Sequence, residues 1–223
     1  MRSNLYFPKV FQFPFHQKPL VVWICLLILF CSSAASAGDD IRQADTLDAR
    51  DLIRQAEKLT RKGAFTEAEK VLRRVIERYP QESKAKLNLA YILIKQRRLV
   101  EAYDFAYPVA KAEPENSYAF ALLGVTYLSA GNFHDAKVLL INALQLNKKE
   151  SMAWAGLGML DYYENRIYNS IDNLREAIFL NPRESDFLFI YAQVNARAEN
   201  YREAAESYRR FLQISPETDN DRR

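Results

Sequence analysis

A repeat of 34 residues runs through most of this chain and constrains its fold more than any other feature. Pro80, Pro114, Pro182 and Pro216 are separated by 34, 68 and 34 residues, and Lys148 stands where one proline of the series is missing. A fixed period of this length is typical of stacked helix pairs, because one pair cannot bury its apolar face alone. The pattern predicts an all-α solenoid that acts through its surface.

The repeat divides residues 49–216 into five contiguous units, the last of them two residues short of 34. Each unit carries a small residue where its two helices should cross closely. These small residues are Ala56, Ala90, Gly124, Gly158 and Ala192 in the first helices and Ala68, Ala102, Ala136, Ser170 and Ala204 in the second helices. The predicted units are 49–82, 83–116, 117–150, 151–184 and 185–216, between a polar leader at 38–48 and a polar tail at 217–223.

The third unit carries the motif by which the chain resembles a known family. Phe120, Leu123-Gly124, Tyr127, Gly131 and Ala136 stand there in the order of a tetratricopeptide repeat. The resemblance covers nearly all of the chain beyond residue 48, and it implies a right-handed superhelix of about five helix pairs. The first helix of each pair would line a concave groove.

Local sequence features give further expectations for the ends of the helices. Serines at the starts of units two to five are suited to cap helix N-termini, and Gly63 and Gly131 are suited to turns with positive φ. Arg97, Asn165 and Glu199 stand at the same place in the other units, so we expect those turns to differ.

Two substitutions also affect the expected packing of the later units. Asp161 and Asn195 replace the aromatic Tyr127 of unit three, and we expect looser packing in units four and five.

The first 37 residues have the composition of a secretory signal. They hold Arg2, Lys9 and Lys18 but no acid, followed by an apolar run from Leu20 to Cys31 and by Ala35-Ser36-Ala37. An apolar run of 12 residues is about 18 Å long as a helix, which is short for a bilayer core of about 30 Å. We predict cleavage after Ala37 and a periplasmic or secreted protein; an uncleaved membrane anchor is the alternative.

Loss of the signal changes the charge balance of the protein. It removes three of the 31 basic residues and none of the 28 acidic ones, so the mature chain is formally neutral. A nucleic-acid or anionic-membrane partner requires clustered positive charge, so we expect neither. Cys25 and Cys31 also leave with the signal, and the exported protein would hold no thiol or disulfide.

What the resemblance implies for binding is a groove lined by first-helix residues that point away from the core. We expect a protein or peptide partner with an apolar segment, extended or helical, because tyrosine and methionine suit such contacts. Met152 and Met159 have packing against a neighbouring first helix as an equal alternative. The candidate groove residues are Tyr91, Lys95, Tyr118, Val125, Leu128, Met152, Met159, Tyr162, Tyr163, Phe189 and Arg197.

Self-association and catalysis are the two alternatives to partner binding. No helix is expected to cover the last repeat, so Tyr208 and Leu212 are candidates for self-association into a homo-oligomer. Catalysis is disfavoured, because the mature chain has His134 as its one histidine, no cysteine, and no phosphate loop or metal-ligand spacing. We expect no catalytic residue, cofactor or metal.

Overall fold

The computed structural model describes residues 48–215, which form ten α-helices and no strand. The predicted signal at 1–37, the leader up to residue 47, Pro216 and the tail at 217–223 lie outside the described residues. The helices are α2 (Ala49–Arg61), α3 (Phe65–Arg78), α4 (Ser83–Lys95), α5 (Leu99–Ala112), α6 (Ser117–Ser129), α7 (Phe133–Leu146), α8 (Ser151–Tyr163), α9 (Ile167–Leu180), α10 (Ser185–Arg197) and α11 (Tyr201–Ile214).

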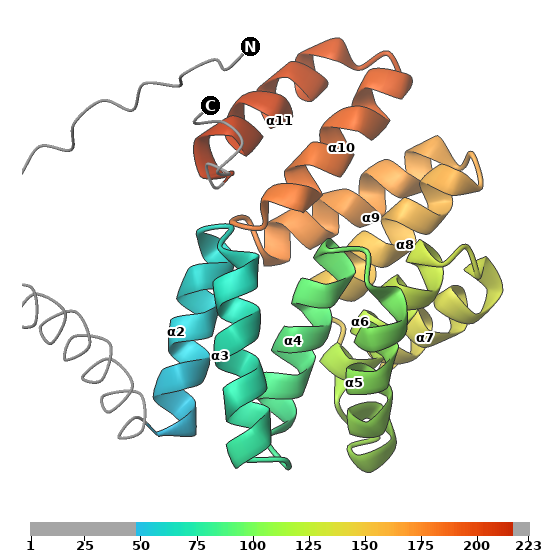
Figure 1. Ribbon diagram of the computed structural model, residues 1–223. Coiled ribbons are helices and arrows are strands. Elements are labelled where there is room, and N and C mark those ends of the chain that lie inside the picture. Colours follow the sequence, from blue (N-terminus) through green and yellow to red (C-terminus); the bar gives the residue numbers. More distant parts are fainter. Residues whose placement is uncertain (1–47, 216–223) are drawn as a thin grey trace, which may run out of the picture. The chain divides into compact units, whose positions relative to one another are not determined.

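The ten helices form five antiparallel pairs stacked into a superhelix (Figure 1). The first helices begin at Ala49, Ser83, Ser117, Ser151 and Ser185, where the sequence units begin. Each first helix packs on its own second helix, and α2, α4, α6 and α8 also pack on the first helix of the next pair. Each of the second helices α3, α5, α7 and α9 also packs on the first helix that follows it. The first helices therefore lie side by side along one face.

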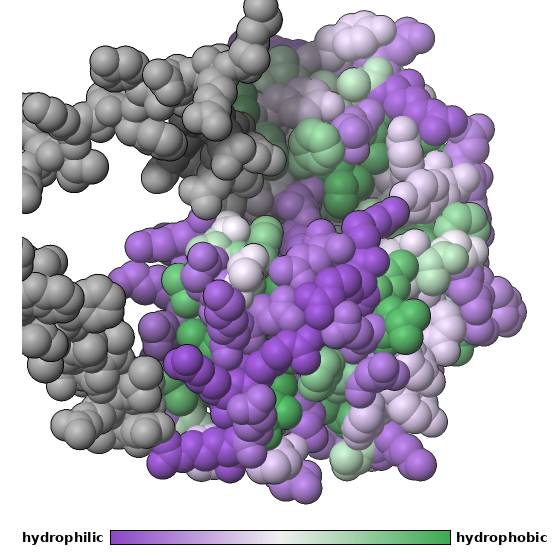
Figure 2. All heavy atoms as spheres, viewed as in Figure 1, coloured by the Kyte–Doolittle hydropathy of each residue, from purple (hydrophilic) through white to green (hydrophobic). Residues whose placement is uncertain are grey.

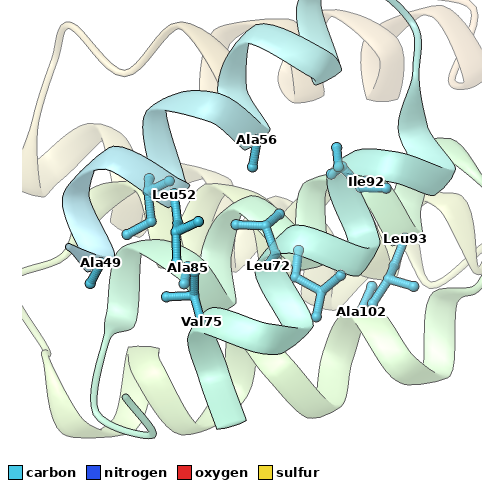
Figure 3. Close-up of a cluster of buried hydrophobic side chains, with 12 residues drawn as sticks. Ala49, Leu52, Ala56, Leu72, Val75, Ala85, Ile92, Leu93 and Ala102 are labelled. Atoms are coloured by element: carbon cyan, nitrogen blue, oxygen red, sulfur yellow. The ribbon is translucent and has the colours of Figure 1, made fainter. Parts of the chain in front are cut away.

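The apolar core is shared between neighbouring pairs. Figure 3 shows Leu52 of α2, Leu72 and Val75 of α3, and Ile92 and Leu93 of α4 converging in one cluster. None of these helices could bury its apolar stripe without the next, which is why the stack needs several units.

Small residues on one helix leave space for leucine side chains of a neighbouring helix. A Cβ atom added at Gly124 of α6 would lie 2.7 Å from Leu140 Cγ of α7, and one at Gly156 of α8 would lie 2.6 Å from Leu140 Cδ2. Leu140 thus occupies space left by glycines of two successive units. The Oγ of Ser170 in α9 donates a hydrogen bond of 2.7 Å to the carbonyl of Gly158, so a hydroxyl is accommodated in the column of alanines.

The serines predicted to cap helices do not do so. Ser83, Ser117, Ser151 and Ser185 are the first residues inside their helices. Among the N-caps of α4, α6, α8 and α10, only Asn116 accepts a backbone hydrogen bond, from Ala119 N at 3.1 Å.

Two of these serines instead bond to acids near the end of their own unit. Ser117 Oγ donates to Glu150 Oε2 at 3.1 Å, and Ser83 Oγ donates to Glu113. The bonded acids stand in the connections that lead to the following first helices. Each hydroxyl joins the start of a unit to the connection at its end instead of capping a helix.

The prediction that three turns differ is wrong. Arg97, Asn165 and Glu199 have φ values of 63°, 61° and 63°, in the same left-handed region as Gly63 at 73° and Gly131 at 83°. The helix pairs impose this turn whatever residue is present. For an L-residue other than glycine or asparagine, that conformation costs roughly 1–2 kcal/mol.

Polar contacts replace the aromatic ring in units four and five. Asp161 is buried and accepts hydrogen bonds from Arg166 Nε at 2.8 Å and from Asn173 Nδ2 at 2.6 Å. Asn195 is buried as well and donates to the carbonyl of Tyr191 at 2.9 Å. Hydrogen bonds therefore take the place of the aromatic packing that these units lack. In unit four they join the first helix to the turn and to the second helix.

The close approach at Gly124 gives a prediction about stability. Gly124→Leu forces a side chain into the space of Leu140, and we expect a loss of about 1–3 kcal/mol in the free energy of unfolding. Urea denaturation followed by circular dichroism measures it. Lys137→Leu, at an exposed position of α7, is the control and should change stability little; equal losses in both variants would contradict close packing at Gly124.

The left-handed turns give a second prediction. Glu199→Gly removes the penalty of positive φ, and after the extra flexibility of glycine in the unfolded chain we expect a gain of about 0.5–1 kcal/mol. Gln193→Gly lies inside α10, where glycine should cost about 1 kcal/mol. Thermal unfolding of both variants should give shifts of opposite sign, and a loss at Glu199 would refute the strained turn.

Candidate functional site

The first helices of four successive units share one hollow, which we call the groove hollow. Its volume is about 220 Å³, and all of its lining residues belong to α4, α6, α8 and α10 or to the turns beside them. Apolar side chains form most of the wall, with Lys95, Arg97, Glu184 and Asp186 at polar positions. The lining residues are Tyr91, Ile94, Lys95, Arg97, Leu122, Val125, Ser129, Met152, Ala155, Met159, Glu184, Asp186, Phe187 and Ile190.

The structure brings five of the predicted groove residues together in this hollow. They are Tyr91 and Lys95 of α4, Val125 of α6, and Met152 and Met159 of α8. Both methionines also contact buried side chains of their neighbours, so they pack and line the surface at once.

Three predicted residues face elsewhere. Leu128 is buried in the core with Ala136 and Leu160, and it is not available at the groove surface. Tyr163 is 56% exposed, but its ring stacks on Phe133 of α7 at a centroid distance of 5.5 Å. Both placements follow from helix geometry, because a shift of one residue rotates a side chain by about 100°.

Phe189 of α10 is the third. Its ring lies 6.0 Å from that of Tyr208 and 5.2 Å from that of Phe211, so it packs on α11. Tyr208 is thereby half-buried, whereas Leu212 is 73% exposed. Of the two candidates for self-association, Leu212 is the more accessible.

The remaining predicted residues lie near the groove hollow without lining it. The guanidinium carbon of Arg197 lies over the ring of Tyr162, 5.0 Å from the ring centroid. Arg197 also donates a hydrogen bond of 2.8 Å to Asn165 Oδ1. Tyr118 lines two other hollows on the side of unit two, and burial raises the pKa of its phenol above the ordinary value.

Sequence reasoning missed part of the wall. Phe187 and Ile190 line the hollow from α10, where Phe189 was expected. Large apolar residues occur on several faces of α10, so the repeat register alone did not show which of them face the hollow. Glu184 was missed because it contacts a helix far away in sequence, and no pattern within one unit signals such a contact.

The polar edge of the hollow is internally paired. Lys95 Nζ lies 3.2 Å from Glu184 Oε1 and also contacts Asp186, and the Tyr91 hydroxyl donates to Glu184 Oε1 at 2.9 Å. Burial, and then the carboxylates of Glu184 and Asp186, hold the pKa of the Tyr91 phenol well above its usual range. Tyr91 therefore stays protonated and remains a hydrogen-bond donor.

The lining and size of the hollow fit side-chain recognition. A volume of about 220 Å³ is below the roughly 300–1,000 Å³ of drug-sized ligand sites, and it suits one or two apolar side chains. Methionine and tyrosine walls adapt to irregular partners. His134 is exposed on α7, away from this hollow.

Residues 48–215 contain neither a cluster of metal-ligating side chains nor a membrane-spanning helix. No group of three or more His, Cys, Asp or Glu side chains is placed there to hold a metal ion. Within the same range, no helix is both long and apolar enough to cross a bilayer. In the view of Figure 2, hydrophilic side chains dominate the middle of the surface, and hydrophobic ones form small patches between them.

Comparison with known proteins agrees with this architecture. Two sequence models of the tetratricopeptide repeat match residues 59–126 and 156–218, together more than half of the chain. A curated relative is anaphase-promoting complex subunit 3 of Schizosaccharomyces pombe, 22% identical over 139 residues. The match covers 62% of this chain but 21% of the yeast protein, so the chain spans about a fifth of that relative.

Solved structures share the fold at low sequence identity. A thermophilic TPR protein of Thermus thermophilus superposes with a TM-score of 0.65 at 17% identity, covering 78% of this chain and 95% of that one. The APC/C hetero-tetramer Cut9-Hcn1 gives a TM-score of 0.63 at 15% identity, with coverage of 78% and 35%. The pilF protein of Pseudomonas aeruginosa gives 0.53 at 18% identity, with coverage of 78% and 79%.

The repeat register, the five stacked helix pairs and both sequence matches lead to one assignment. The fold is that of a protein-interaction scaffold. The chain belongs to the tetratricopeptide repeat family.

Proposed function

We propose that this protein is an exported, non-enzymatic scaffold that binds a polypeptide partner on its concave face. An apolar side chain of the partner would enter the groove hollow. The observation that carries the proposal is the convergence of Leu122, Val125, Met152, Met159 and Ile190, from three different first helices, on one accessible apolar hollow. Buried apolar anchors of this kind supply most of the affinity at protein interfaces.

The setting we propose is an envelope or secretion assembly outside the cytoplasm. The basic, apolar and small-residue segments of residues 1–37 support export. The same fold occurs in the APC/C hetero-tetramer Cut9-Hcn1, which supports a role within a larger assembly.

A displayed random-peptide library tests partner binding. Peptides selected on the purified protein should carry an apolar anchor, and calorimetry should show that Met159→Arg weakens their binding at least about tenfold, which is about 1.4 kcal/mol. A charge at Met159 would leave an apolar anchor without its contacts. Val100→Arg, at an exposed site of α5 outside the hollow, is the matched control.

One outcome would contradict binding of the anchor in the groove hollow. If Met159→Arg retains wild-type helicity and binds the selected peptides as tightly as Val100→Arg does, the anchor lies elsewhere. Circular dichroism of both variants shows whether helicity is retained.

Self-assembly through α11 is the second candidate. It is favoured by the exposure of Tyr201, Leu212 and Ile214 on the last helix of the stack. Light scattering separates the two functions: a dimer that Leu212→Glu converts to a monomer supports self-assembly, and a wild-type monomer at tens of micromolar excludes it.

A further inference from the structure

One set of polar contacts crosses the concave face between units that are not neighbours. We propose that Tyr91 and Lys95 of α4 and Glu184 and Asp186 at the start of α10 form a clasp that closes the superhelix across the groove hollow. The clasp opens when a longer partner segment lies along the groove. The existence of the clasp is independent of the function proposed above; its effect on binding rests on that function.

The clasp spans an unusually long separation in sequence. Glu184 lies 93 residues from Tyr91 and 89 from Lys95, and Asp186 lies 91 from Lys95. The bond of Arg197 to Asn165, by comparison, joins adjacent units, and that of Ser117 to Glu150 lies within unit three. Nearest-neighbour stacking does not require a contact between unit two and the junction of units four and five.

Glu184 stands at the N-cap of α10 but does not cap it. Its side chain accepts no hydrogen bond from that helix, although a carboxylate there is well placed to do so. It accepts instead from Tyr91 at 2.9 Å and from Lys95 at 3.2 Å. In Figure 1 the turn before α10 lies beside the ends of α2 and α4, in agreement with these contacts.

The burial of the clasp favours reversible opening. The side chains of Lys95 and Glu184 are 19% and 22% exposed, and that of Asp186 is 48% exposed. The Lys95 ammonium also lies 5.0 Å from the centroid of the Tyr91 ring. In a partly buried ion pair the loss of hydration offsets much of the attraction, so the closed form gains little over an open one.

The clasp separates two hollows of the concave face. Its four residues line the groove hollow on one side and a neighbouring hollow of about 610 Å³ on the other. The second hollow is also lined by Thr60, Arg61 and Phe65 of unit one and by Phe211 and Ile214 of α11. Opening the clasp would join the two into one groove, long enough for a segment instead of a single anchor.

Charge reversal with distance measurement tests the clasp without any ligand. Spin labels at Asp104→Cys of α5 and Arg209→Cys of α11, in the full chain with Cys25 and Cys31 changed to serine, report the distance between units two and five. Lys95→Glu repels both acids, and we expect the distance distribution to move to longer values. Adding Glu184→Lys and Asp186→Lys to that variant should restore the original distribution.

Lys84→Glu is the matched control. Lys84 also lies on α4 and pairs with Glu57 at 2.9 Å, but this contact joins units one and two, so the labelled distance should not change. A wild-type distribution in Lys95→Glu with unchanged helicity would overturn the clasp. An equal shift in Lys84→Glu would overturn it too.

Binding of a library-selected peptide long enough to span both hollows tests the consequence. Glu184→Gln with Asp186→Asn should bind this peptide several-fold more tightly, because a larger fraction of the protein is open before binding. If the spin-label distance increases in Lys95→Glu but the peptide does not bind more tightly to the Glu184→Gln, Asp186→Asn variant, the clasp exists but does not control binding. If the peptides bind Met159→Arg as tightly as the wild type, while the spin-label distances change as expected, the proposed function alone is overturned.

Discussion

The structure depends on leucine side chains that fit against glycine on neighbouring helices. Leu140 occupies space beside Gly124 of its own unit and Gly156 of the next, and Leu174 meets Gly158 in the same way. Because protein interiors are close-packed, such contacts fix both the crossing within a pair and the spacing between pairs. The first helices then lie side by side, and the groove hollow is a consequence of that spacing.

The groove combines an adaptable apolar wall with a closed polar edge. Four first helices supply the wall, while the curvature of the stack brings Glu184, the last residue of unit four, to Tyr91 and Lys95 of unit two. The polar groups that a partner would meet first are therefore occupied by the protein itself. A partner would have to compete with the chain's own carboxylates, which connects recognition to the shape of the superhelix.

Much of the fold could be predicted from the sequence, because each unit repeats the same local pattern of small and large residues. The pattern also located Tyr91, Val125, Met152 and Met159 at the hollow. It failed where tertiary contact overrides local preference. Glu199 adopts a turn normally left to glycine, since two packed helices impose the conformation.

Rotation about a helix axis explains the other errors. Leu128 and Phe189 share the apolar character of groove residues but point to the core and to α11. The clasp could not be predicted at all, because it depends on the curvature accumulated over three units.

Partner binding on the concave face formed by the first helices is open to one direct measurement. Methyl NMR with a library-selected peptide tests it most directly, because methyl groups of Leu122, Val125, Met152, Met159 and Ile190 report on the groove hollow. We expect their resonances to shift on binding while those of Val100 and Val138, on second helices, do not. Shifts confined to Val100, Val138 or other second-helix methyl groups would contradict it.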